Sequence, residues 1–418
     1  MSRRLVLRNF FALSGVQIVN YLVPIVVVPL SLKIVGLEQF GRVVLLQSII
    51  WILTSVVEYG FPVSGARQIA WLESKIDGLS KIVSHIMLAR LYFFIAVGVI
   101  MILATLPIYR NWLSTTELMV VMLGILGNTI NPSWFHHGIQ RMEFIAFWNA
   151  ISKVVYLIAI IFLVRAPSDY LLIIGLYGLI NVLVSGVILR FIYSRYELTF
   201  LWPTWYDIKY QFKIALPLFV PSIGSAIIIG ANPIVLFLFS SGQNLGEFGV
   251  VEKVSIAFWQ IASSFNQATF PQVCKLASCN SSAFDYKRFY FRIYLPFIII
   301  FLSAITLISF FNHEVISLIF GLNNEIADGM LIKIIWVPFL IALNIPANQM
   351  LLAFSIDGVY NKIFLLTLII YLISGIFLTI NYSADGTIAA MIITQFCLTA
   401  LLYLGFYQFT FLNFRNNR

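Results

Sequence analysis

Polar and charged side chains recur on one face of an apolar segment near the start of the chain. Gln47, Thr54 and Glu58 follow a helical repeat, and Trp51 and Ser55 share their face. An ionisable side chain is costly in hydrocarbon unless it meets a partner or water. The pattern therefore indicates hydrogen bonding and charge inside a helix bundle or a water-filled cavity.

A second stripe follows about half a chain later. Lys253, Gln260, Ser264 and Gln267 share one helix face, and Glu252 adjoins Lys253 in the chain. Matching stripes in the two halves predict one polar cavity between them. Two structural alternatives stay open: the hydroxyls can bond backbone carbonyls or neighbouring helices, and Glu58 with Lys253 can form an ion pair between the halves.

Three further cations fall within predicted spans. Arg42 lies at the outer end of its segment, and Arg90 and Lys153 lie several residues inside theirs. Long basic side chains near a membrane surface can extend to water. If they turn inward instead, they add positive charge to the cavity.

Catalytic and metal-binding patterns are missing from the sequence. It has no phosphate-binding G-x-x-x-x-G-K-[ST] loop, and its three cysteines form no C-x-x-C pair. His136 and His137 are adjacent, so on a helix they point about 100° apart and do not share a metal. We predict no catalytic residues, no cofactor and no metal, and hence a transporter rather than an enzyme.

Composition sets the class of fold. Apolar residues make up 61% of the chain and charged residues 10%, far from the quarter that is usual in soluble domains. The apolar runs are about 20 residues long, as membrane-spanning helices require. We predict an all-α polytopic membrane protein with twelve transmembrane helices, at about 9–32, 41–63, 84–106, 116–137, 146–165, 170–193, 213–239, 248–271, 293–312, 331–355, 362–382 and 386–411.

The two halves repeat each other. Phe40-Gly41 and Trp51 correspond to Phe248-Gly249 and Trp259 at a shift of 208 residues, and Phe61-Pro62 corresponds to Phe270-Pro271 at 209. We predict an N-terminal lobe at 1–195, a cytoplasmic linker at 196–212 and a C-terminal lobe at 213–418, related by an axis along the membrane normal. Helix bending is expected at Pro24, Pro29, Pro217, Pro221 and Pro233.

Basic residues predict the orientation. They gather at one set of helix ends, which includes Arg3, Arg190 and Lys287, and loops rich in Lys and Arg stay cytoplasmic. Both termini are therefore expected in the cytoplasm. The net charge of +9 reflects this topology and attraction to anionic membrane lipids, so nucleic acid is not an expected partner.

A family resemblance rests on the first seventy residues. Asn20-Tyr21-Leu22-Val23-Pro24-Ile25, Val35-Gly36-Leu37-Glu38-Gln39-Phe40-Gly41, Glu58-Tyr59-Gly60-Phe61 and Ala66-Arg67-Gln68-Ile69-Ala70 resemble the polysaccharide-exporter branch of the multidrug/oligosaccharidyl-lipid/polysaccharide superfamily, the O-antigen flippases (Wzx-type) above all. The resemblance implies two six-helix lobes around a central cationic cavity, as in the multidrug (MATE) transporters of that superfamily.

The resemblance also implies a function. The substrate would be an undecaprenyl-pyrophosphate-linked oligosaccharide, moved by alternating access to the periplasmic leaflet of a bacterial inner membrane. Arg42, Arg90, Lys153 and Lys253 are then the candidate phosphate contacts. Implied partners are a coupling ion, proton or sodium, and a polysaccharide polymerase with its chain-length regulator. The alternatives are a cation-coupled multidrug antiporter, expected to carry an acidic residue in its first span, and a membrane-embedded polymerase, expected to have a long outer loop.

Overall fold

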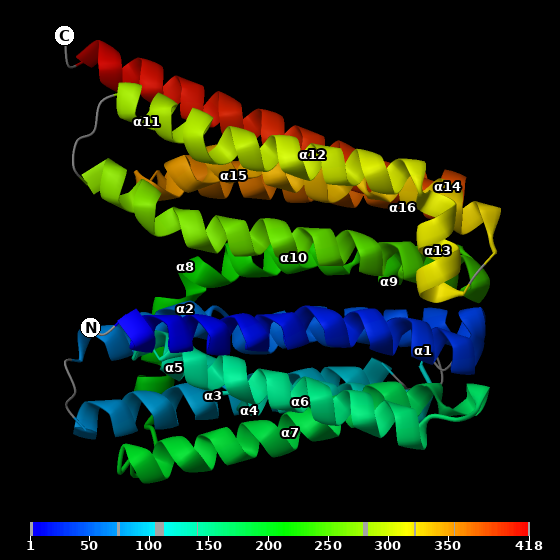
Figure 1. Cartoon of the computed structure of the whole chain (residues 1–418). Helices are drawn as coiled ribbons and strands as arrows, with labels where there is room; N and C mark the ends of the chain where they lie inside the picture. The colour runs from blue at the N-terminus through cyan, green and yellow to red at the C-terminus, as the bar shows by residue number, and fades with distance from the viewer. Residues whose placement is uncertain are drawn as a thin grey trace. The chain divides into compact units, whose positions relative to one another are not determined.

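The computed structural model describes residues 3–72, 76–104, 113–139, 141–278, 283–321, 323–354 and 356–416. These residues are almost entirely helical, and no strand occurs among them (Figure 1). The chain divides into two compact units, Met1–Ala231 and Asn232–Arg418. The predicted all-α class is confirmed.

The first unit contains eight α-helices in its described part. They are α1 (Arg3–Glu58), α2 (Phe61–Trp71), α3 (Ile76–Ala104), α4 (Thr115–Ile130), α5 (Ser133–Gly138), α6 (Met142–Leu163), α7 (Tyr170–Arg195) and α8 (Trp205–Gly230), with a 3-10 turn, η2 (Pro167–Asp169), before α7. The long element α1 is two helices, because Gly36 leaves helical geometry at a φ of 80°. Such a left-handed backbone favours glycine.

Glycines bring α4 and α7 into close contact. A Cβ atom added to Gly178 of α7 would lie 2.7 Å from the backbone nitrogen of Gly124 on α4, and one added to Gly127 would lie 3.0 Å from the carbonyl oxygen of Gly178. The Ser185 hydroxyl donates to the Gly127 carbonyl at 3.2 Å. Small residues with a bonded hydroxyl are typical of helix packing in membranes, and Figure 1 shows α3, α4, α6 and α7 lying alongside one another in this unit.

The described part of the second unit contains α9 (Asn232–Phe239), α10 (Gly242–Ser278), α11 (Ala283–Phe289), a π-helical turn η3 (Tyr290–Tyr294), α12 (Leu295–Phe310), α13 (Asn312–Phe320), α14 (Glu325–Ile334), α15 (Trp336–Ala353) and α16 (Asp357–Asn416). Element α16 is also two helices, which meet at Ser383 with a φ of 54°. Aromatic and aliphatic side chains of α10, η3, α12 and α15 form one hydrophobic cluster, and side chains of α15 and α16 form another.

Eight described stretches are long and apolar enough to cross a membrane, or nine if the bent helix α8 is one span. Two of the eight, Val23–Glu58 and Gly358–Gln408, each overlap two of the predicted spans. The predicted span at 248–271 lies in α10, which is not among the eight because amides and charges interrupt its apolar residues. A multi-pass helical protein is confirmed, and the number twelve stays a prediction.

Helix α8 packs within the first unit. The side-chain amides of Gln68 on α2 and Gln211 on α8 donate to each other at 2.9 and 3.1 Å. Ahead of α8, the backbone N–H groups of Thr199 and Leu201 donate to the Ser80 and Ser84 hydroxyls of α3, at 3.1 and 3.0 Å. The compact units therefore divide after Ala231, whereas the predicted repeat places α8 at the start of the second lobe.

Candidate functional site

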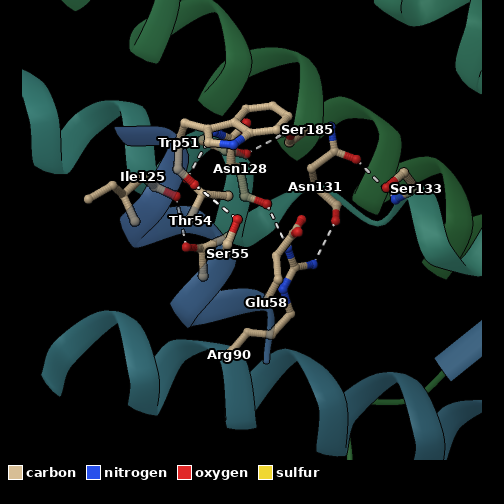
Figure 2. Close-up of polar contacts among 12 residues, drawn as sticks. Trp51, Thr54, Ser55, Glu58, Arg90, Ile125, Asn128, Asn131, Ser133 and Ser185 are labelled. Carbon is tan, nitrogen blue, oxygen red and sulfur yellow. Dashed lines mark hydrogen bonds and ion pairs between the residues drawn. The ribbon is translucent and has the colours of Figure 1, made fainter. Parts of the chain in front are cut away.

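The polar stripe of α1 ends in a buried ionic contact between three helices (Figure 2). Arg90 of α3 is 1% exposed, and its Nη2 lies 3.5 Å from Oε1 of Glu58 at the end of α1. The two guanidinium Nη atoms also donate at 2.8 Å to the carbonyl oxygens of Asn131 and Asn128. We call Glu58, Arg90, Asn128 and Asn131 the charged junction.

The carbonyls that Arg90 binds belong to the last turn of α4. The final carbonyls of a helix lack intrahelical partners and carry partial negative charge, so a guanidinium is a suitable cap. Asn131 follows α4, and its side-chain Oδ1 accepts from the backbone N–H of Ser133 at 2.9 Å. Ser133 is the first residue of α5. Arg90 therefore fixes the end of α4 against α1, and its charge is balanced by Glu58 and the helix terminus.

Backbone geometry places Glu58 at the end of α1. Tyr59 and Gly60 have φ values of 44° and 77°, which stop the helix. The Tyr59 ring stacks on Phe93 of α3 and Phe219 of α8, with centroids 4.6 and 4.5 Å apart. A Cβ atom on Gly60 would lie 2.9 Å from the Ala215 carbonyl oxygen. Aromatic packing and a close backbone approach thus hold the carboxylate in place.

The rest of the α1 stripe combines backbone bonds with exposed groups. The Ser55 hydroxyl donates to the Trp51 carbonyl at 3.1 Å, as the structural alternative predicted. Thr54 accepts from the Asn128 amide at 3.3 Å. Gln47 is half-buried, Glu58 is 35% exposed and Trp51 is 47% exposed. The face is therefore polar, and it is partly open beside the charged junction.

Arg42 is held at the start of α4. Its Nε lies 3.4 Å from Oε1 of Glu117, a carboxylate that is 1% exposed. Glu117 also accepts from the Tyr170 hydroxyl at 3.3 Å and from the Ser114 N–H at 2.7 Å, as part of the N-terminal cap of α4. A carboxylate suits the positive end of a helix. Arg42 thus ties α1 to this cap.

A polar contact of the second unit joins α10, η3 and α15 without charges. The Gln349 amide donates to the Thr269 hydroxyl at 2.9 Å and to the carbonyl and side-chain oxygens of Asn266, at 2.8 and 2.6 Å. Its oxygen accepts from the Tyr294 hydroxyl. Gln349 is fully buried. We call Asn266, Thr269, Tyr294 and Gln349 the neutral junction.

The predicted residues of α10 lie at different depths. Glu252 is buried, Lys253 and Gln260 are half-buried, and Gln267 is exposed with its amide 3.4 Å from the Ser263 hydroxyl. The Ser264 hydroxyl donates to the Gln260 carbonyl at 3.0 Å, which is the backbone bonding that the structural alternative predicted.

The predicted cation Lys153 lies in the first unit, where it is half-buried on α6. The roles of Lys153 and of the α10 residues in substrate binding stay predictions.

Two ion pairs of the second unit are more exposed than the Glu58–Arg90 pair of the first. His313 Nδ1 of α13 lies 2.8 Å from Asp328 Oδ2 of α14, and Lys333 Nζ lies 2.8 Å from Asp385 Oδ1. The side chain of His313 is 57% exposed. Among the described residues there is no group of three side chains that could hold a metal ion.

The predicted bending prolines lie in different settings. Pro24 and Pro29 lie inside α1, whose non-helical residue is Gly36. Pro217 lies in the first part of α8, and the parts of α8 before and after Pro221 differ in direction by 46°. The side chain of Pro221 is outside the described part of the structure. Pro233 is the second residue of α9, where proline costs no helical hydrogen bond.

Sequence reasoning missed the partners of the predicted charges. Asn128 and Asn131 of the fourth predicted span, Glu117 at its start, and Asn266, Tyr294 and Gln349 of the second unit were not singled out. Asn131 precedes a proline, as Asn232 does, and the Asn-Pro pair lies at a helix boundary in both places: after the end of α4 and at the start of α9. Glu117 also has a local signal, because Ser114-x-x-Glu117 fits the capping-box pattern at the start of a helix. The remaining partners have none, because their contacts join distant segments.

Comparison with known proteins places the chain in a family. The model of the family described as polysaccharide biosynthesis protein matches residues 6–277. The chain belongs to that family. It is 21% identical over 397 residues to a putative O-antigen transporter of Shigella dysenteriae, covering 93% of this chain and 96% of the relative. It is 23% identical over 411 residues to another from Escherichia coli K12, covering 95% of each.

Solved structures share the fold of this family member. A lipid II flippase MurJ in an inward closed conformation aligns with a TM-score of 0.74 at 11% identity, over 93% of this chain and 86% of that one. An inward-facing multidrug resistance MATE transporter of the MOP superfamily aligns with a TM-score of 0.66 at 14% identity, over 92% and 93%. The resemblance predicted from the sequence is confirmed. These relatives are named as transporters and a flippase, in agreement with the predicted class.

Proposed function

We propose that this protein moves an undecaprenyl-pyrophosphate-linked O-antigen oligosaccharide from the cytoplasmic to the periplasmic leaflet of a bacterial inner membrane. In this proposal two lobes of six spans alternately open a central cavity to either side, and both termini are cytoplasmic. Family membership and the O-antigen transporter relatives support the substrate class. The observation that carries the proposal is the polar stripe that leads along α1 to Glu58 and Arg90.

Physical chemistry explains why such a stripe suits this substrate. Sugar hydroxyls and a pyrophosphate cannot leave water for hydrocarbon without compensating hydrogen bonds and charges, whereas a polyprenyl tail is stable in lipid. The buried Arg90 has both Nη atoms on carbonyls and is paired with Glu58, so it holds the helices in place rather than contacting the phosphate. Arg42, which is 28% exposed, and the half-buried Lys153 and Lys253 are the proposed phosphate contacts.

Deleting the gene from the source bacterium tests the function. We expect the lipid-linked oligosaccharide to accumulate and surface O-antigen to disappear, and a plasmid copy to restore it. The double variant Arg42→Ala with Lys253→Ala should fail to restore O-antigen while its protein is still found in the membrane. Lys33→Ala, which removes an exposed lysine of α1, is the matched control. Full restoration by the double variant would remove these cations from the mechanism.

A cation-coupled multidrug antiporter is the second candidate, because MATE transporters share the fold. It predicts that the deletion strain keeps its O-antigen and becomes sensitive to cationic dyes. A flippase predicts the opposite pattern. If transport is coupled to a proton or sodium gradient, the ionophore that collapses that gradient should stop translocation in vesicles. The polymerase and chain-length regulator are proposed to act on the flipped product.

A further inference from the structure

We infer that the indole ring of Trp51 is a stacking surface for a sugar ring of the transported glycan. This inference rests on the proposed function and assigns one subsite within it. The apolar C–H face of a pyranose packs on an aromatic ring, while its hydroxyl groups at the edge bond to polar side chains. Trp51 and its neighbours on α1 and α4 supply both features within the first unit (Figure 2).

The open side of Trp51 lies on a polar face. Trp51 is 47% exposed, and Glu58, two helical turns further along, is 35% exposed on the same face of α1. Thr54 and Ser55 lie between them. A carboxylate that faced acyl chains would carry a large cost, so this face is turned to a polar environment. The exposed indole therefore belongs to that environment.

Trp51 is poorly placed to act as an interfacial membrane anchor. Tryptophans that anchor membrane proteins lie at the headgroup level, near the ends of spans. Trp51 is seven residues from the end of α1 at Glu58, about 10 Å along the helix axis. The non-helical Gly36 lies fifteen residues away in the other direction, about 22 Å, so Trp51 is inside the helix rather than at either end. A large aromatic ring on a polar face at that depth suits a ligand better than a lipid headgroup.

The ring has a defined seat. A Cβ atom added to Gly230, the last residue of α8, would clash with Cδ1 of Trp51. The edge of the indole thus rests where a side chain is missing. The Trp51 carbonyl accepts from the Ser55 hydroxyl, which also steadies this turn. A pre-positioned ring loses little conformational entropy when a ligand binds.

Hydrogen-bonding groups lie on the same face as the ring, Thr54 close to it and Glu58 two turns further along. The Asn128 amide bonds to Thr54 at 3.3 Å, so α4 contributes to the same surface as α1. Glu58 uses one oxygen on Arg90 and is partly exposed, so it can accept from a sugar hydroxyl. An aromatic surface with a few fixed polar groups is the usual composition of a small-molecule site.

Binding measurements test the inference with purified protein in nanodiscs. The probes are the undecaprenyl-pyrophosphate oligosaccharide extracted from the deletion strain, and undecaprenyl pyrophosphate without sugar. We expect Trp51→Ala to weaken binding of the glycan form at least about tenfold, near 1.4 kcal/mol, and to leave the sugar-free lipid unchanged. Trp51→Phe should retain most of the affinity. Gly230→Ala should weaken glycan binding by displacing the ring.

Trp71→Ala is the matched control, because Trp71 is 77% exposed at the end of α2, away from the stripe, and should leave both affinities unchanged. Equal affinity of the Trp51→Ala and unmodified proteins for the glycan would overturn the inference. So would an equal loss for both probes. If the unmodified protein binds neither probe and the deletion strain keeps its O-antigen, the proposed function itself fails.

Discussion

The charged and neutral junctions do the same structural work with different chemistry. In the first unit, Arg90 joins α3 to α1 and α4 through a carboxylate and two carbonyls. In the second unit, Gln349 joins α15 to α10 and η3 through hydroxyl and amide groups. Both connect the second, third and fourth predicted spans of their half. Charges are therefore not needed to hold three such helices together.

The difference indicates what the charges are for. Burying an ion pair costs about as much as its attraction returns, and neutral replacements are often as stable. The first unit nevertheless keeps Arg90 and a partly exposed Glu58 where the second unit uses neutral groups. Under the proposed function, the partly exposed Glu58 supplies a hydrogen-bond acceptor on the path of the glycan, and Arg90 holds it in place.

The largest expected effect comes from removing Arg90. Arg90→Ala leaves Glu58 without its partner and removes the guanidinium that donates to the Asn128 and Asn131 carbonyls; the Asn128 carbonyl keeps only the Asn131 N–H. We expect a loss of about 3 kcal/mol, the lower end for breaking a buried pair, because Glu58 is partly exposed. Thermal unfolding of the purified protein in detergent measures it. An unchanged midpoint would show that the junction does not stabilise the unit.

A double substitution makes the charged junction resemble the neutral one. Glu58→Gln with Arg90→Gln should be more stable than Arg90→Ala, because no charge is left unpaired. We expect both variants to lose O-antigen export, the double variant despite a normal protein level. Restored export would mean that the pair serves stability alone.

The next largest effect is expected in the neutral junction. Gln349→Leu keeps the side chain's bulk but leaves the Tyr294 and Thr269 hydroxyls and the Asn266 carbonyl without their amide partner. The expected cost is about 2 kcal/mol in unfolding free energy, typical of buried groups that lose a partner. Gln349→Glu, compared at low and neutral pH, shows whether a charge is tolerated there. A loss as large as that of Arg90→Ala would erase the contrast between the junctions.

The helix ends also differ between the halves, and substitutions that add or remove a glycine at corresponding positions test this difference. Helix α1 ends at Glu58, before the left-handed Tyr59 and Gly60, whereas α10 continues through Phe270 and Pro271. Gly60→Ala should cost about 1–2 kcal/mol in backbone strain, besides the clash with Ala215. Ala268→Gly, at the corresponding turn of α10, should cost only about 1 kcal/mol of helix propensity. The same unfolding assay compares them, and a larger loss for Ala268→Gly would contradict this account.

The smallest expected effect concerns the exposed ion pair of the second unit. The hydrogen bond to Asp328 raises the pKa of His313 above its ordinary value, with the Asp328 charge acting in the same direction. A histidine whose pKa is higher in the folded state than in the unfolded state stabilises the protein fully at pH values below the unfolded-state pKa. This stabilisation is lost as the pH rises through the folded-state pKa. Between about pH 6 and pH 8 we expect a small fall in unfolding temperature that His313→Gln abolishes. If the unfolding temperature of His313→Gln fell by the same amount, another titrating group would be responsible for the pH dependence.

Sequence alone predicted the class of fold and the residues that carry charge. Composition and run length suffice for membrane helices, since hydrocarbon accepts little else. Glu58 and Arg90 were found because charges in apolar runs stand out. Their pairing was not, because it depends on how α1 and α3 pack around the end of α4. The neutral junction escaped notice because amides and hydroxyls are common, and only the fold shows which of them meet.

The bonds that Ser80 and Ser84 make to the stretch before α8 bear on how the polypeptide can be divided. Helix α8 is also bonded to α2 through the Gln68 and Gln211 amides. A cut between 196 and 212 would therefore remove from the N-terminal fragment a helix that packs within it. Expressed as two pieces, the protein should be separated after Ala231, where each fragment keeps its own neighbours.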